Sequence, residues 1–174
     1  MYIGHVGAAL AGKRARRNIA LLVLLVATYT PDWVDSGLCV AGAFNPTEML
    51  SHSIPAVLLF AIAGFVLYGA LARDWKGALV VAAVIVSHLL LDWITGYKPT
   101  WPGGPMIGLD LYEHPMLDFL AEAVVIVIGA ILYARTLPRP ERLWRNLSIM
   151  AGSLLFMQLA IDVAHLLMKS LPKC

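Results

Sequence analysis

The chain has 174 residues, of which 60% are hydrophobic and only 14% are charged, and its mean hydropathy is +0.77. This composition excludes an ordinary soluble domain and a disordered chain. The net charge of +2 is too small to indicate nucleic-acid binding. We therefore expect one all-α integral-membrane domain over residues 1–174, a polytopic helical bundle in contact with the lipid bilayer.

The apolar segments predict about five transmembrane helices and a short N-terminal helix. The first apolar stretch, residues 2–10, is too short to cross a hydrocarbon core of about 30 Å, so we expect it to pack against the bundle. Each later segment approaches the roughly 20 residues that a spanning helix needs. These segments are residues 18–33, 54–72, 77–94, 115–134 and 147–168.

Short basic clusters predict the orientation in the membrane. They occur at residues 13–17, 73–76 and 135–145, whereas the connections 31–53 and 95–114 carry a single base, Lys98. Basic clusters beside spans face the cytoplasm. We therefore expect a multi-pass protein of the bacterial inner membrane whose connections 31–53 and 95–114 lie on the periplasmic side.

Histidines and acidic residues fall mostly on this predicted outer side, in short motifs. In chain order the motifs are Gly4-His5, Pro31-Asp32-Trp-Val-Asp35, Ser51-His52-Ser53, His88 with Asp92, and His114 with Asp118. We expect Pro31 to help end a helix and to leave Asp32 and Asp35 at its outer terminus. The short first helix is expected to carry His5 upward to meet the other imidazoles.

The pair His88 and Asp92 lies four residues apart in an apolar span, so both side chains share one helical face. Such groups are costly in hydrocarbon unless something compensates them. A single buried histidine usually hydrogen-bonds a neighbouring helix, but five histidines and nine acids gather here with almost no basic partners. Protons or metal ions must balance this charge, and imidazole with carboxylate favours zinc, manganese or iron. We expect a divalent metal, zinc before the others.

The same motifs, together with Pro102-Gly-Gly-Pro-Met-Ile-Gly-Leu-Asp-Leu-Tyr112, resemble those of the bacterial membrane-bound metal-dependent hydrolases over residues 1–135. Their order is more distantly similar to that of the zinc-dependent phospholipase C and single-strand nuclease fold. The resemblance implies a site for two or three ions with seven ligands. These ligands are His5, Asp32, His52, His88, Asp92, His114 and Asp118.

Further carboxylates are candidates for supporting roles. Glu122 and Asp35 are the candidate catalytic carboxylates, with Glu122 either a general base or a partner of a metal ligand. Asp162 and His165 share one face of the last span, and we expect them to be accessory to the site. The turn-rich segment 99–105 is either a rigid cap of the bundle or a lid over the site.

The leading hypothesis is a metal-dependent hydrolase that cleaves an ester or phosphoester, of a lipid, at the outer face of the inner membrane. A transporter of metal ions or protons is the alternative, and it predicts polar helix faces that continue to the cytoplasmic side. The third possibility is a non-catalytic subunit of a membrane complex. The sequence names neither a substrate nor a protein partner.

Overall fold

The computed structural model describes residues 2–43, 49–137 and 142–167, and helices make up most of them. The long helices are α1 (Gly4–Ala15), α2 (Leu21–Val40), α3 (Ile54–Ala72), α4 (Trp75–Thr95), α5 (Pro115–Ala134) and α6 (Leu143–Leu167). Two single turns and a short antiparallel hairpin complete the described chain: η1 (Leu50–His52), η2 (Leu111–Glu113), β1 (Lys98–Pro99) and β2 (Met106–Ile107). The predicted all-α class is confirmed.

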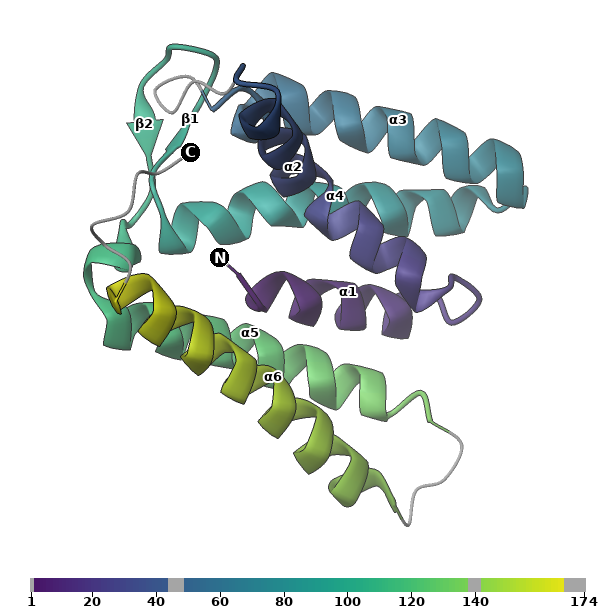
Figure 1. Cartoon of the computed structure of the whole chain (residues 1–174). Coiled ribbons are helices and arrows are strands. Elements are labelled where there is room, and N and C mark those ends of the chain that lie inside the picture. Colours follow the sequence, from purple (N-terminus) through teal and green to yellow (C-terminus); the bar gives the residue numbers. More distant parts are fainter. Residues whose placement is uncertain (1, 44–48, 138–141, 168–174) are drawn as a thin grey trace.

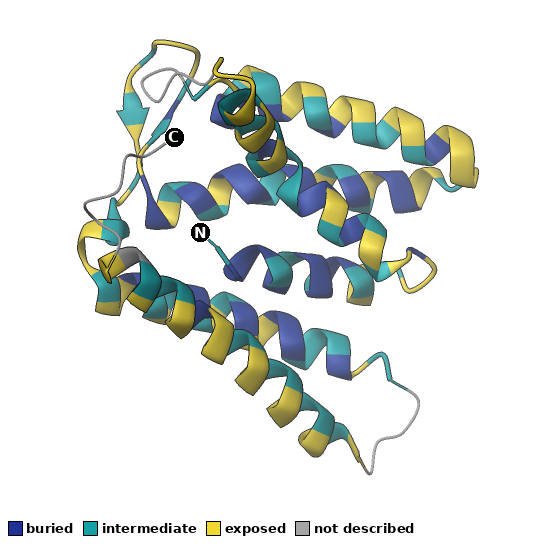
Figure 2. Cartoon of the chain, viewed as in Figure 1, coloured by how far each residue is buried: buried dark blue, intermediate teal, exposed yellow. Residues whose placement is uncertain are grey.

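The short helix α1 lies in the middle of the bundle, between α4 on one side and α5 on the other (Figure 1). Helix α3 packs on α4, α6 packs on α5, and α2 crosses α1 and α4. Buried residues gather on α1 and on the faces of α4 and α5 that turn toward it (Figure 2). The expectation that the first apolar stretch packs against the bundle is confirmed, and α1 brings His5 into the centre.

The outward faces of the helices are apolar, as contact with lipid requires. Leu59 and Leu71 of α3 and Phe156 of α6 are exposed by 63%, 78% and 72%. Among the described residues, α3, α4, α5 and α6 are long and apolar enough to cross a membrane. Most of the expected fifth span, 18–33, lies in α2, which begins only at Leu21. Helix α2 is not in this set because polar and charged residues in its second half lower its hydropathy.

Helix α2 does not end near Pro31, so that expectation is wrong. The helix continues for nine residues beyond this proline, to Val40, and Pro31 is buried inside it. A proline lacks the N–H that an interior helical position normally donates, which disfavours such a position. Contacts beyond the proline compensate, because Asp32 and Asp35 both reach His52 from the continuing helix.

The two ends of the bundle differ in chemistry. At one end lie the connections from α1 to α2 and from α3 to α4, the end of α5 and the start of α6; the hairpin lies at the other (Figure 1). At the first end the Arg16 guanidinium donates to both oxygens of Asp74, at 2.9 Å each. The Asp74 carboxylate also accepts the Gly77 N–H and so caps the start of α4. This pair therefore ties α1 to the turn between α3 and α4.

We expect Asp74→Ala to lower the thermal unfolding midpoint by a few degrees, because it removes an ion pair and a helix cap together. Hydrogen bonds from Arg16 and from the Gly77 N–H lower the pKa of Asp74 below its ordinary value of 3.8. A carboxyl group with a lowered pKa contributes stability that is present above its ordinary pKa and is lost as the pH falls through the lowered one.

Thermal unfolding of purified protein in detergent at pH 7 and near pH 3 checks this expectation. The difference between wild type and Asp74→Ala should shrink at the lower pH. Glu113→Ala is the control, because Glu113 is an exposed acid at the opposite end of the bundle. An equal loss in both variants, or a loss that does not depend on pH, would contradict the assigned role of Asp74.

Two glycines allow the backbones of α1 and α5 to touch. A Cβ atom added to Gly7 would meet the backbone carbonyl of Val125, and one added to Gly129 would meet the backbone of Gly7. Small residues at helix crossings permit this close approach in membrane proteins, where packing and not the hydrophobic effect holds helices together. The crossing sets the position of α1, and with it the position of His5.

Gly7→Ala should therefore destabilise the fold by about 1–3 kcal/mol, the usual cost of overpacking a tight interior. Reversible unfolding in detergent or denaturant measures this change. Gly37→Ala is the matched control, since no atom of the described residues lies within 4 Å of a Cβ added at Gly37. A Gly7→Ala variant as stable as wild type would show that α1 and α5 do not meet in this way.

Candidate metal centre

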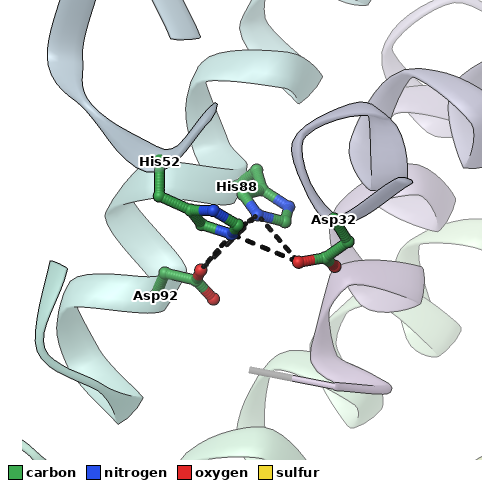
Figure 3. Close-up of side chains that lie close together, drawn as sticks. All are labelled: Asp32, His52, His88 and Asp92. Carbon is green, nitrogen blue, oxygen red and sulfur yellow. Dashed lines mark hydrogen bonds and ion pairs between the residues drawn. The ribbon is translucent and has the colours of Figure 1, made fainter. Parts of the chain in front are cut away.

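Four side chains from three elements converge at the hairpin end of the bundle (Figure 3). Asp32 comes from α2, His52 from η1, and His88 with Asp92 from neighbouring turns of α4. Each offers one ligand atom, and these atoms all lie within 4.8 Å of one another. The i, i+4 pair on α4 predicted from the sequence thus faces two partners from outside its own helix.

The spacing of the four ligand atoms fits one small divalent ion. The His52 Nε2 atom lies 3.1 Å from His88 Nε2 and 3.2 Å from both Asp32 Oδ1 and Asp92 Oδ2. The His88 Nε2 atom lies 3.6 Å from Asp32 Oδ1 and 3.5 Å from Asp92 Oδ2. Ligands bound tetrahedrally at about 2.0–2.2 Å from an ion are about 3.3–3.6 Å apart. Five of the six distances are therefore close to those of a tetrahedral site, and the sixth, between the two carboxylate oxygens, is within 4.8 Å, so these four residues could hold one metal ion.

Contacts on the far side of both imidazoles orient their Nε2 atoms toward the cluster. The His88 Nδ1 atom donates to the backbone carbonyl of Thr28, at 2.7 Å. The His52 Nδ1 atom lies 2.8 Å from the Asp35 carboxylate and 2.9 Å from the Ser51 hydroxyl. Partners of this kind fix the ring orientation and tautomer of metal-binding histidines. In the neutral rings, both Nε2 atoms then present lone pairs.

The cluster therefore places four hydrogen-bond acceptor atoms within 4.8 Å of one another, and a cation among them is needed to offset their mutual repulsion. A proton on His52 or a metal ion would meet this need. Burial lowers the pKa of His52, but hydrogen bonds from its ring to Asp32, Asp35 and Asp92 outweigh burial and raise that pKa from 6.5 to about 10. A metal that binds here would displace this proton.

His5 reaches the same cluster from α1. Its side chain is fully buried, and its ring stacks on the ring of His88 with 4.0 Å between centroids. Its Nε2 atom lies 3.2 Å from Asp92 Oδ1, and neither ring nitrogen forms a hydrogen bond with the described residues. Asp92 thus presents one oxygen to His52 and His88 and the other to His5, so His5 is placed to hold Asp92 or a further ion.

Lys98 is a residue that the sequence did not single out for the site. It lies on β1, and its Nζ atom is 3.3 Å from Asp92 Oδ2. The feature of the sequence that could have identified it is that Lys98 is the single base in the two predicted outer connections. In the segment 99–105 that follows it, the Thr100 carbonyl accepts from the Ile54 N–H, and the Thr100 N–H donates to the Pro105 carbonyl. The hairpin thus contacts the start of α3 and carries the lysine to the site.

The two candidate catalytic carboxylates have different surroundings. Asp35 contacts the Nδ1 side of His52, away from the four ligand atoms. Glu122 is fully buried, and its two oxygens accept the N–H groups of Tyr2 and Gly4 at 2.7 and 2.8 Å. A carboxylate at this position satisfies the first turn of α1 and favours its dipole. The contacts of both residues point to positioning of His52 and α1, and their catalytic roles stay predictions.

The remaining predicted ligands lie apart from the group of four. His114 is exposed at the N-terminus of α5, whereas Asp118 is buried on that helix near Asp162 of α6. Asp162 accepts from the Gln158 side chain at 2.7 Å. The side chain of His165 lies outside the described residues. Of the four histidines whose side chains the structure describes, it brings His5, His52 and His88 together.

The fold and the site define an all-α integral membrane protein with a buried histidine and aspartate centre at one end of its bundle. The family model described as YdjM inner membrane protein matches residues 1–165, so the chain belongs to the YdjM inner membrane protein family. It is thus an inner-membrane protein. No curated protein and no solved structure matches it. The family description names no reaction, so the predicted hydrolase activity stays a prediction.

Proposed function

We propose that this protein is a membrane-embedded metal-dependent hydrolase that cleaves an ester or phosphoester of a lipid. The observation that carries the proposal is the facing pair of imidazole Nε2 atoms, 3.1 Å apart, with a carboxylate oxygen 3.2 Å away on either side. Both rings are held from behind by Thr28 and Asp35, so they cannot turn their donors inward without losing those contacts. A resident divalent cation explains this arrangement.

The proposed ligands are Asp32, His52, His88 and Asp92, with His5 beside them. Two imidazoles and two carboxylates suit zinc first, and manganese or iron as well. A bound divalent ion would supply Lewis acidity and lower the pKa of water at the site. Lys98 adds a fixed positive charge next to Asp92, which would attract an anionic group and stabilise negative charge on it.

The opening of the site supports a substrate that stands at the membrane surface. The Asp32 side chain is 37% exposed, whereas His52, His88 and Asp92 are exposed by 3% or less. A substrate would therefore approach from the Asp32 side, at the end of the bundle. The basic clusters flank the opposite end, which by the positive-inside rule is cytoplasmic, so the proposed site faces the periplasm.

The packing beyond the site supports hydrolysis over transport. One and two turns from His88 toward the other end of α4, the buried residues are Val84, Ile85 and Val81. They belong to an apolar core with Leu24 and Ala61. A conduction path for ions or protons needs polar groups at that depth.

Purified protein loaded with zinc tests the proposal. We expect it to release product from a phospholipid in mixed micelles, and we expect Asp92→Asn to abolish this release while remaining folded by circular dichroism. Elemental analysis should find metal in the wild type. Wild-type protein that binds no zinc, manganese or iron would refute the proposal, and a metal-loaded protein that accumulates ions in vesicles without hydrolysing any ester would favour the transporter.

A further inference from the structure

A hollow of about 620 Å³ lies between α2 and α3, with α4 as its floor. It forms because the two helices meet near η1 and contact each other little elsewhere, while each packs on α4. Small side chains deepen it, among them Ala27 of α2 and Ala63 and Gly64 of α3. The floor consists of Val81 and Ile85.

The lining of this groove accepts only an apolar occupant. Among the described residues that line it, none is charged, and the hydroxyl groups are those of Thr30 and Tyr68. The Thr30 hydroxyl already donates to the Val26 carbonyl at 2.8 Å. Helices α3 and α4, which form one wall and the floor, are long and apolar enough to lie in the hydrocarbon core. The medium that meets this groove is therefore the acyl chains of the bilayer.

The length of the groove matches one acyl chain. Along α3 it extends from Phe60 to Ala72, which is twelve steps of the helical rise and thus about 18 Å. An acyl chain that spans one leaflet, half of a hydrocarbon core of about 30 Å, is about 15 Å long. A single extended chain would fill the groove from end to end.

The groove approaches the metal centre along α2 and α4. Thr30 on the groove wall is two residues before Asp32 in α2, and Ile85 on the floor is three residues before His88 in α4, so each is within one helical turn of the centre. On the α3 wall the groove begins at Phe60, eight residues after His52, and runs to Ala72, the last residue of that helix. A chain lying in the groove would therefore point its polar end toward the Asp32 side of the centre, the side that is open.

We propose that this groove binds one acyl chain of a membrane lipid and presents the polar linkage of that lipid to the histidine and aspartate centre. The inference that an acyl chain binds here rests on the geometry and lining of the groove alone. The statement that the bound lipid is the substrate rests on the proposed hydrolase function. The proposed ligand is thus a long-chain glycerolipid, whose acyl chain binds in the groove and whose polar linkage lies at the centre.

The binding part is tested with a phospholipid that carries a photoactivatable diazirine in one acyl chain. The full chain is reconstituted in vesicles of phosphatidylethanolamine and phosphatidylglycerol that contain this probe, illuminated, and mapped by mass spectrometry. We expect label to concentrate on groove residues such as Val26, Phe60 and Leu67 over other lipid-facing positions. Label spread evenly over the outward faces of α3, α5 and α6 would overturn the proposal, and so would crosslinks from these residues to a second copy of the chain.

Filling the groove provides the matched comparison. Ala63→Phe places a ring in the hollow, whereas Ala70→Phe makes the same change at an exposed position of α3 outside it. We expect Ala63→Phe to reduce groove labelling about tenfold, as the loss of about two buried methylenes would do, and Ala70→Phe to leave it unchanged. Leu67→Trp is a second filling variant should Ala63→Phe fail to fold. Unchanged labelling in a folded filling variant would overturn the proposal.

The substrate part is tested separately, by hydrolysis of a long-chain and of a short-chain soluble phospholipid. Ala63→Phe should raise KM about tenfold for the long-chain lipid and leave the short-chain reaction unchanged. Equal effects on both lipids would overturn the assignment of the chain in the groove to the substrate. Labelling of the groove by a protein that hydrolyses neither lipid would support the lipid site and refute the hydrolase, so the two failures are distinguishable.

Discussion

His88→Ala should reduce the bound metal from about one ion per chain to nearly none. The His88 Nε2 atom is one of four ligand atoms around a single point, and its ring is held there by the Thr28 carbonyl. Loss of a partner that only supports a ligand commonly weakens metal affinity about 10–100-fold, so loss of the ligand itself should exceed that range. Elemental analysis of purified protein and a competition titration with a chelator measure the change.

His114→Ala is the matched control for this result. His114 has the same side chain and lies near the same end of the bundle, but it is exposed at the start of α5 and is not in the group of four. We expect it to retain its metal. Equal metal content in His88→Ala and wild type would show that the metal is not bound by the group of four residues described here. A loss in His114→Ala equal to that in His88→Ala would instead restore the wider ligand set that the sequence predicted.

Lys98→Met should lower kcat for a phosphoester substrate by about 100-fold with little change in metal content. The Lys98 ammonium lies 3.3 Å from Asp92 Oδ2, on the hairpin above the centre, so it is placed to stabilise charge that develops on a substrate oxygen. Methionine keeps most of the length of the side chain and removes only the charge. Lys98→Arg should retain part of the wild-type kcat because it keeps the positive charge.

Lys76→Met is the control, because Lys76 carries the same charge on α4 at the opposite end of the bundle. It should leave kcat and metal content unchanged. Should Lys98→Met lose its metal along with its activity, the lysine would be a structural partner of Asp92 and not a group that acts on substrate. An unchanged kcat would show that Lys98 has no part in the reaction.

Much of the fold follows from the order of apolar residues along the chain. The boundaries of α3 and α5 were predicted to the residue, because a spanning helix must satisfy every backbone polar group within its own segment. The boundary of α2 was not, since it depends on contacts that Asp32 and Asp35 make with His52 across the bundle. A proline inside a helix is tolerated where such contacts hold the chain beyond it.

The site was predicted in part for the same reason. His88 and Asp92 share a face of one helix, and helical spacing alone brings them together. Lys98 and Thr28 could not be identified as their partners, because one acts through a hairpin that folds over the bundle and the other through a backbone carbonyl. His114 and Asp118 have the same spacing as His88 and Asp92, yet their helix packs mainly on α1 and α6 and contacts α4 little, and neither residue is in the group of four.

The sequence by itself therefore determined the membrane class, the helices and the local pairing of ligands, all of which depend on neighbours within about one helical turn. The tertiary structure alone decided which pairs meet. That choice depends on how closely helices approach and at what height, which close contacts such as that between Gly7 and Gly129 determine. This packing stacks the ring of His5 on the ring of His88. It brings motifs that lie far apart in the sequence into one centre, with an apolar groove beside it.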